Sequence, residues 1–275
     1  MNILLCTPIF AQHADAGIFF LAALSRHGHR VTVWDHRHEP VCPKVAVDAS
    51  IVLKGSFDPA MLPPGKKLAY WPDRLGREPH WEQYLPAYDR VFTCLRPTPP
   101  AMVWLPGFFD PLLHRPDPRL ARHFIMLYGT HTDNKEKVLQ SLIPENPTMP
   151  HLPLIIFGNG WPERLHTNPP VYMHALVAML SGALVSINVH RDPGVGLNRR
   201  LFESAACAPT LTDDVPGARE VVPEEMIYSS TQDLRMKIEY LLGDPKRMLD
   251  MYQRGRAAIA PYTYEQGVQR MLTEV

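Results

Sequence analysis

The sequence lacks an excess of charge, a cysteine framework and any long uninterrupted apolar run. Lysine plus arginine and aspartate plus glutamate both number 28 in 275 residues, so the formal net charge is zero. A neutral chain has no long-range field that gathers a polyanion, which disfavours nucleic acid as an obligate partner. A local basic surface is still compatible with this balance.

Cysteines number only 4, and none has the spacing of a metal-ligand or redox pair. Cys6 and Cys207 lie inside apolar runs, where a lone thiol usually fills space in the core. The amino terminus also lacks the basic segment and cleavage site of a signal peptide. These features predict a cytoplasmic protein.

The longest apolar stretch, residues 171–189, is interrupted by His174, Ser181, Gly182 and Asn188. We therefore predict a helix followed by a strand in this stretch, and no membrane span. Prolines number 29, which favours many rigid loops over long helices.

What the sequence does contain is a globular composition, with 45% hydrophobic and 20% charged residues. Residues 2–7 form an apolar run typical of a buried parallel strand, and apolar residues then recur at helical spacing up to Arg26. Gly28 is placed to end that helix, and residues 30–34 predict the next strand. This β-loop-α-β order is the start of a doubly wound sheet.

Two such series follow one another along the chain. Further strands of the first are predicted at residues 49–53, 67–71, 89–94 and 102–105, and the proline-rich residues 110–118 predict a linker. The second is predicted from strands at residues 123–129, 154–157, 183–189 and 209–212 and from helices at residues 135–142, 171–180, 197–206 and 231–242.

We therefore predict an α/β fold with two Rossmann-like doubly wound domains, residues 1–118 and 119–258. A C-terminal helix in residues 259–275 is expected to pack back on the first domain. A ligand site is expected in a central cleft between the carboxyl ends of the two sheets.

The most informative motif is a glycine-containing turn, with Gly194 and Gly196, that leads into a predicted helix. The amide groups and positive dipole end of a helix N-terminus suit a diphosphate, and Arg199 and Arg200 add cationic groups at the same place. Glu203 lies one turn beyond Arg200, so it can share its face and accept hydrogen bonds from sugar hydroxyls. The alternative is a surface helix with ordinary Arg–Glu pairs.

A set of ordered motifs carries a resemblance to a known family. The run Gly196-Leu197-Asn198-Arg199-Arg200-Leu201-Phe202-Glu203 is followed by Thr212-Asp213 and Pro216-Gly217. This pattern resembles the donor-binding segment of GT-B glycosyltransferases, and more narrowly of their CgeB-like (spore-maturation-protein) branch. Further matches are Gly158-Asn159-Gly160-Trp161-Pro162, Ser186-Ile187-Asn188-Val189-His190-Arg191 and Tyr262-Thr263-Tyr264. The resemblance covers residues 128–272 well and the first domain more loosely.

The resemblance implies a GT-B fold with an N-terminal acceptor domain and a C-terminal donor domain. It implies transfer of a hexose from a nucleotide diphosphate sugar, most simply a UDP-sugar, to an acceptor hydroxyl. Glu203 then resembles the glutamate that holds the ribose. The other donor-binding residues implied are Gly158, Asn159 and Trp161 beside the base and phosphates, with His190, Gly196, Asn198 and Arg200 near the diphosphate and sugar.

Lys135 is a further candidate ligand for the phosphates, because a cation after the first strand of the donor domain is common among such enzymes. It lies in a loop that opens a predicted helix. An ordinary solvated lysine is an equal alternative.

Three residues of the first domain are candidates for the catalytic base. His13 and Asp15 lie in the loop of residues 8–17, where an acceptor loop would face the cleft, and Asp73 follows a predicted strand. Either residue type can deprotonate a hydroxyl, and a polar loop with ordinary hydrogen bonds is the alternative.

Related retaining enzymes have a second glutamate eight residues before the ribose glutamate, where this chain has Val195. Retaining stereochemistry is therefore not inherited from the resemblance, and Asp192 is the only acid suggested as a substitute. No Asp-x-Asp motif or metal-ligand cluster is found either. We expect a metal-independent reaction that requires no cofactor, in which helix dipoles and cations neutralise the leaving diphosphate.

Several functions remain open on these residues. The acceptor can be a small molecule, a glycan or a hydroxymethylated base in DNA. A sugar-nucleotide epimerase or a non-catalytic sugar-nucleotide binder would need the same donor residues. An NAD-dependent dehydrogenase is disfavoured, because the loop after the first strand has only Gly17 and no GxGxxG motif.

Overall fold

The computed structural model divides the chain into two units. Unit 1 consists of Met1–Asp110 and Tyr262–Val275, and unit 2 consists of Pro111–Pro261. The structure describes residues 1–7, 16–36, 38–54, 58–72, 79–143, 153–165, 167–191, 196–273 and 275, apart from the side chains of residues 81 and 164. The predicted α/β class with two Rossmann-like units is confirmed.

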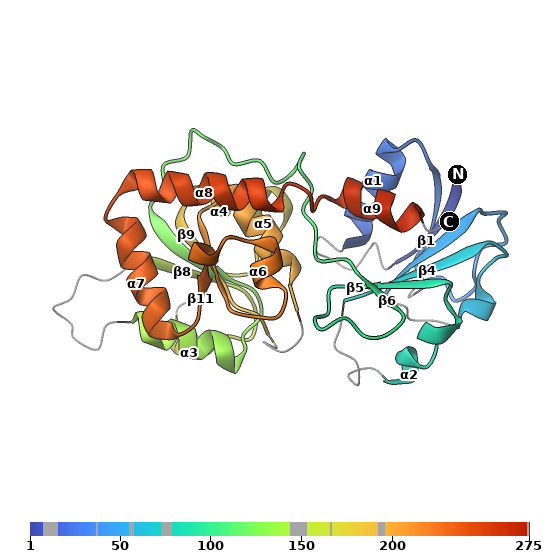
Figure 1. Cartoon of the computed structure of the whole chain (residues 1–275), viewed down its shortest axis with the longest axis horizontal. Helices are drawn as coiled ribbons and strands as arrows, with labels where there is room; N and C mark the ends of the chain where they lie inside the picture. The colour runs from blue at the N-terminus through green and yellow to red at the C-terminus, as the bar shows by residue number, and fades with distance from the viewer. Residues whose placement is uncertain are drawn as a thin grey trace. The chain divides into compact units, whose positions relative to one another are not determined.

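Unit 1 is built on a parallel sheet of six strands in the order β2-β1-β3-β4-β5-β6 (Figure 1). Near-continuous apolar runs form these strands because both faces of a doubly wound sheet are buried. Their bounds, within one residue of the predicted ranges, are β1 Asn2–Cys6, β2 Arg30–Trp34, β3 Ala49–Leu53, β4 Lys66–Trp71, β5 Arg90–Thr93 and β6 Met102–Trp104.

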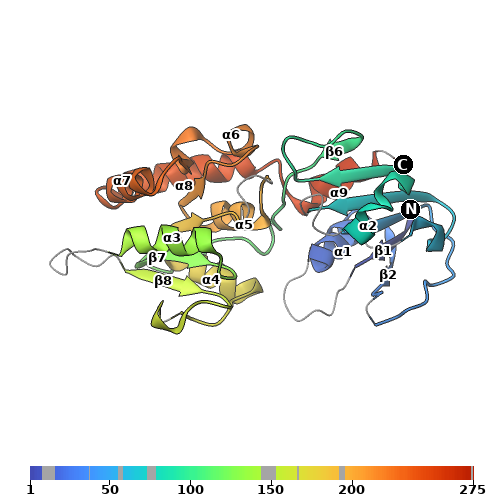
Figure 2. The same ribbon diagram turned by 90° about the horizontal axis from the view of Figure 1, so that it is seen from below.

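The C-terminal helix α9 (Tyr264–Leu272) belongs to unit 1 and packs beside the first helix, α1 (Ala16–Arg26). Figure 2 also shows the two helices side by side, although they come from opposite ends of the chain. Aromatic rings join them, since the Phe19 and Tyr264 rings stack at 5.0 Å and the Phe20 and Tyr264 rings meet edge to face at 5.4 Å. Unit 1 also contains the short helix α2 (Pro79–Glu82).

Unit 2 contains a parallel sheet of five strands in the order β11-β10-β9-β7-β8. The strands are β7 Phe124–Tyr128, β8 Leu154–Phe157, β9 Ala183–Asn188, β10 Thr210–Asp213 and β11 Ile227–Tyr228. The helices are α3 Asp133–Leu142, α4 Met173–Gly182, α5 Arg199–Cys207, α6 Ala218–Val221, α7 Thr231–Leu242 and α8 Pro245–Ile259.

The order of the strands in unit 2 reverses at β7, which has β8 on one side and β9 on the other. In open α/β sheets, ligands bind outside the carboxyl ends of the strands at such a reversal. The strand order therefore indicates a ligand site at the end of β7, at Tyr128 and the residues after it.

The apolar stretch at residues 171–189 forms the helix α4 followed directly by the strand β9, as predicted. Cys6 and Cys207 are both fully buried, as expected of core residues. In the part of the chain that the structure describes, no helix has the length and apolar character needed to span a membrane.

Gly267 on α9 fixes how closely this helix approaches Phe108. A Cβ atom at Gly267 would lie 2.4 Å from the Phe108 ring. We predict that Gly267→Ala lowers the free energy of unfolding by about 1–3 kcal/mol through overpacking, despite the better helix propensity of alanine. Urea denaturation measures this change.

Gly255→Ala on α8 is the matched control. Its Cβ would meet the flexible end of Met226 at 2.8 Å, which can move away. We expect a change within about 1 kcal/mol, because lost space and gained helix propensity offset each other. Equal effects of the two substitutions would show that Phe108 does not limit the packing of α9.

Candidate functional site

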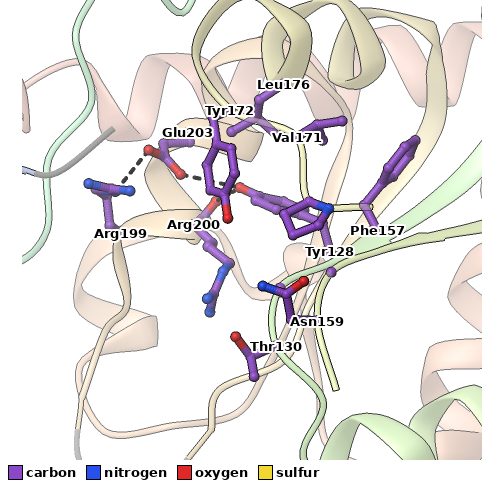
Figure 3. A pocket seen from close by; sticks show the side chains of 13 residues that line it. Tyr128, Thr130, Phe157, Asn159, Val171, Tyr172, Leu176, Arg199, Arg200 and Glu203 are labelled. Atoms are coloured by element: carbon purple, nitrogen blue, oxygen red, sulfur yellow. Dashed lines mark hydrogen bonds and ion pairs between the residues drawn. The ribbon is translucent and has the colours of Figure 1, made fainter. Parts of the chain in front are cut away.

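A pocket lies at the carboxyl edge of the second sheet, where β7 and β8 end (Figure 3). It holds about 520 Å³ of empty space, part of it open to solvent. Its walls come from the strand ends, the start of α4 and the first turns of α5. They consist of Tyr128, Gly129, Thr130, Phe157, Gly158, Asn159, Pro170, Val171, Tyr172, Leu176, Arg199, Arg200 and Glu203.

Two glycines let the backbone and a guanidinium group come close together at this edge. Gly129 and Gly158 have φ values of 116° and 146°, which side chains rarely allow. A Cβ at Gly129 would lie 2.8 Å from Cζ of Arg200, and one at Gly158 would lie 2.1 Å from the Gly129 oxygen. The Arg200 side chain therefore lies directly over the end of β7.

Arg200 lines the pocket, and two further cations, Lys135 and Arg191, are linked to it because the charges of Arg200 and Arg191 both act on Lys135. Lys135 is only 2% exposed, and its Nζ donates a hydrogen bond to the Thr130 carbonyl oxygen at 2.6 Å. Burial lowers the pKa of Lys135 to about 7, helped by the charges of Arg200 and Arg191 and opposed by Asp213. Among the described residues, the Arg200 guanidinium has no hydrogen-bond acceptor or acidic partner. Such a group attracts an anion.

The helix α5 adds its N-terminus to these cations. Asn198 is the N-cap, and its Oδ1 accepts a hydrogen bond from the Leu201 amide at 3.1 Å. Gly196, with φ of 98°, turns the chain into the helix. The helix thus begins at Arg199, two residues later than predicted, and its positive end lies beside Arg200.

Among the described residues of the pocket lining, Glu203 is the one carboxylate, and it is 3% exposed. It accepts from Nε of Arg199 at 2.9 Å and from the Tyr128 hydroxyl at 3.4 Å, and Nε2 of His114 lies 3.8 Å away. Burial and the nearby Glu203 charge raise the pKa of Tyr128 well above its usual value. Glu203 lines the pocket with Arg200 and also pairs with Arg199, while residues 201–207 of this helix are buried and so do not form a surface helix.

His190 forms a buried pair with Asp213 at the ends of β9 and β10. Its Nδ1 lies 2.5 Å from Oδ1 of Asp213, and its backbone amide donates to Oδ2 at 3.0 Å. The ring is 2% exposed, and within the described chain its Nε2 is buried without a hydrogen-bond partner. Since Asp213 also acts on the charge of Lys135, this pair adjoins the cations.

The structure brings most of the predicted donor residues to one place. Gly158, Asn159, Arg200 and Glu203 line the pocket, and Lys135, Gly196, Asn198 and His190 lie in the elements around it. Trp161 is outside the pocket lining: its Nε1 donates to the Gly129 carbonyl oxygen at 3.0 Å, and its ring meets His131 edge to face. It holds the loop after β8 against the end of β7.

The three predicted catalytic residues, His13, Asp15 and Asp73, lie outside the described residues, and so do Asp192, Gly194 and Val195. Over the described ranges, no group of three histidine, cysteine, aspartate or glutamate side chains is arranged to hold a metal ion.

Sequence reasoning missed Tyr128, Tyr172 and His114. Tyr128 had a usable signal, because it ends the strand at which the sheet order reverses. His114 had none, since 88 positions separate it from Glu203 and no motif connects them.

The two units have the GT-B glycosyltransferase fold, as the similarity to three solved structures shows. T4 phage BGT in complex with UDP and Mn²⁺ has a TM-score of 0.67 at 10% identity, over 100% of this chain and 99% of that one. AviGT4, a glycosyltransferase involved in avilamycin A biosynthesis, has a TM-score of 0.67 at 13% identity, over 99% of this chain and 96% of that one. Anabaena Alr3699/HepE in complex with UDP-glucose has a TM-score of 0.68 at 11% identity, over 100% of both chains.

The chain belongs to the glycosyl transferase-like family, whose model matches residues 134–273, slightly more than half of the 275 residues. No curated protein matches it in sequence. At 10–13% identity, the structural similarity concerns the fold.

The lowered pKa of Lys135 predicts how stability depends on pH. Below about pH 7 the ammonium is charged in both the folded and unfolded states, and its burial opposes folding. Between about pH 7 and 10, Lys135 is neutral in the folded state and still protonated in the unfolded state. The free energy of unfolding should therefore rise with pH over this range, relative to Lys135→Met, by about 1.4 kcal/mol per pH unit at most.

Urea denaturation of both proteins at about pH 6 and about pH 9 measures this difference. The natural protein should have a lower free energy of unfolding than Lys135→Met near pH 6, and the difference should shrink or reverse near pH 9. A difference that stays constant with pH would mean that Lys135 remains protonated in the folded protein.

Proposed function

We propose that this chain transfers a hexose from a UDP-sugar to an acceptor hydroxyl. The single observation that carries this proposal is that a buried carboxylate, Glu203, and the Arg200 guanidinium line one pocket, with Lys135 close enough to feel the Arg200 charge. A carboxylate accepts from ribose hydroxyls, and the cations neutralise a diphosphate. A nucleoside diphosphate presents both kinds of group.

In this proposal, the nucleotide occupies the pocket with its ribose at Glu203. Phe157, Pro170, Val171 and Tyr172 supply the apolar wall that a flat base requires, and Gly158 and Asn159 lie beside it. The diphosphate lies at Arg200, Lys135 and the N-terminus of α5, with Gly196, Asn198 and His190 next to it. Trp161 acts by holding the loop that carries Gly158 and Asn159.

Two kinds of support come from outside this chain. The family is that of glycosyl transferase-like proteins, and two structural neighbours were solved with UDP or UDP-glucose bound. The motifs around Glu203 and after β8 favour the CgeB-like branch. We propose residues 1–118 as the acceptor domain, 119–258 as the donor domain and 259–275 as a helix of the acceptor domain.

For the chemical step, we propose that a base of the first domain takes the proton of the acceptor hydroxyl. The candidates are His13, Asp15 and Asp73. The acceptor oxygen forms a bond to the anomeric carbon while the bond from that carbon to the diphosphate oxygen breaks. UDP leaves with its added negative charge neutralised by Arg200, Lys135 and the α5 dipole, without a metal ion. The acceptor is a small molecule, a glycan or a hydroxymethylated DNA base.

The direct test is a thermal-shift and hydrolysis screen with UDP-, GDP- and dTDP-sugars, each with EDTA and with Mn²⁺. We expect stabilisation by UDP and the UDP-sugars that persists in EDTA. Absence of stabilisation by every nucleotide would refute the donor site. Conversion of the donor sugar without acceptor would indicate an epimerase, and binding without turnover or hydrolysis would indicate a non-catalytic binder.

Arg200→Met tests the diphosphate position. Loss of a charged hydrogen-bond donor should weaken UDP binding about 10- to 100-fold and leave uridine binding unchanged, because uridine carries no phosphate. Isothermal titration calorimetry measures both. Arg254→Met, which removes a half-exposed arginine on α8, is the control and should bind UDP normally. Equal losses for UDP and uridine would place Arg200 elsewhere than at the phosphates.

A further inference from the structure

Two Arg–Glu pairs with the same spacing occupy different surroundings in unit 2. Arg199 and Glu203 on α5 are four residues apart, with 2.9 Å between Nε and Oε1. Arg235 and Glu239 on α7 have the same spacing and a distance of 3.1 Å. The Glu239 side chain is 61% exposed and that of Glu203 is 4% exposed. An exposed pair contributes little, whereas a buried carboxylate depends on its partner.

The two oxygens of Glu203 are not used equally. Oε1 accepts from Arg199, and His114 lies 3.8 Å from the same oxygen. In the described chain, Oε2 has only the Tyr128 hydroxyl, at 3.4 Å. That hydroxyl has one proton and a second acceptor, the Arg200 carbonyl oxygen at 3.2 Å. Oε2 therefore keeps unused capacity to accept a hydrogen bond.

Arg199 determines where this oxygen points. A glutamate side chain turns about its terminal bond with little preference, so a single contact at 3.4 Å leaves the carboxylate plane poorly fixed. The short contact with the Arg199 guanidinium fixes Oε1 and, with it, the direction of Oε2. Figure 3 shows Arg199 on the far side of Glu203 from Tyr128, with the carboxylate held between them.

We propose that Arg199 is a positioning residue that holds the Glu203 carboxylate so that Oε2 accepts from the ribose 2′-hydroxyl, which makes the site selective for ribonucleotides over 2′-deoxyribonucleotides. This inference rests on the proposed donor site. It narrows the donor class to sugars linked to ribonucleoside diphosphates and excludes the dTDP-sugars, which lack that hydroxyl. A site built to bind a hydroxyl rejects an analogue without it, because its buried acceptor is left unpaired.

The test compares the affinities of UDP and 2′-deoxy-UDP by isothermal titration calorimetry. The natural protein should bind UDP at least about tenfold more tightly, as expected for a hydrogen bond to a charged acceptor. In Arg199→Met, the affinity for UDP should fall to nearly that for 2′-deoxy-UDP, so that the ratio of the two affinities drops to about threefold or less. Arg235→Met removes the equivalent exposed arginine and should keep the full ratio.

Arg199→Lys provides a second variant in case the methionine variant does not fold. Lysine keeps the positive charge beside Glu203 but lacks the planar Nε group, so the protein should fold while the ratio falls at least about threefold. Thermal unfolding, with and without UDP, checks that each variant is folded and binds.

Other results would overturn the inference. Equal weakening of both nucleotides in Arg199→Met would mean that Arg199 contacts the phosphates, and an unchanged ratio would mean that Glu203 needs no positioning. Equal affinities of the natural protein for UDP and 2′-deoxy-UDP would show that Glu203 does not bind the 2′-hydroxyl, while the donor site itself would stand. Binding of neither nucleotide to the natural protein would instead refute the proposed function.

Discussion

A buried carboxylate is stable only if positive charge and hydrogen-bond donors surround it. Glu203 is such a carboxylate, and the polar contacts of unit 2 around it meet this requirement. Arg199 answers it from the same helix and Tyr128 from β7. The hydroxyls of Ser186 and Ser204 continue the network, since Ser186 donates to Ser204 at 3.1 Å and Ser204 donates to Tyr128 at 3.2 Å. One acidic side chain thus connects β7, β9 and α5 through buried polar contacts.

The pocket combines opposite charges a short distance apart. Its carboxylate pairs with Arg199, whereas among the described residues Arg200 has no acidic partner and Asp213 is the acid that acts on Lys135. Such a site is complementary to a ligand with hydroxyls at one end and negative charge at the other. Gly129 and Gly158 allow this arrangement, because any side chain there would collide with Arg200 or with the backbone.

The sequence predicted the architecture well, because continuous apolar runs such as residues 183–188 have few alternatives to a buried parallel strand. It did not predict β11 or α6, since two- and four-residue elements are too short to show a period. For the site, glycine and arginine spacing was sufficient to bring Arg200 and Glu203 into one pocket. The contact of His114 with Glu203 depends on the path of residues 111–123, and the position of Trp161 depends on its hydrogen bond to Gly129; both arise from tertiary packing.

Unit 1 is discontinuous, because residues 262–275 complete it only after all of unit 2 has intervened. During synthesis, Phe19 and Phe20 on α1 are made before unit 2, but their partner Tyr264 is made after it. Unit 2 is a single stretch and can finish folding first. The aromatic core of unit 1 is therefore completed only after the whole of unit 2 has been made.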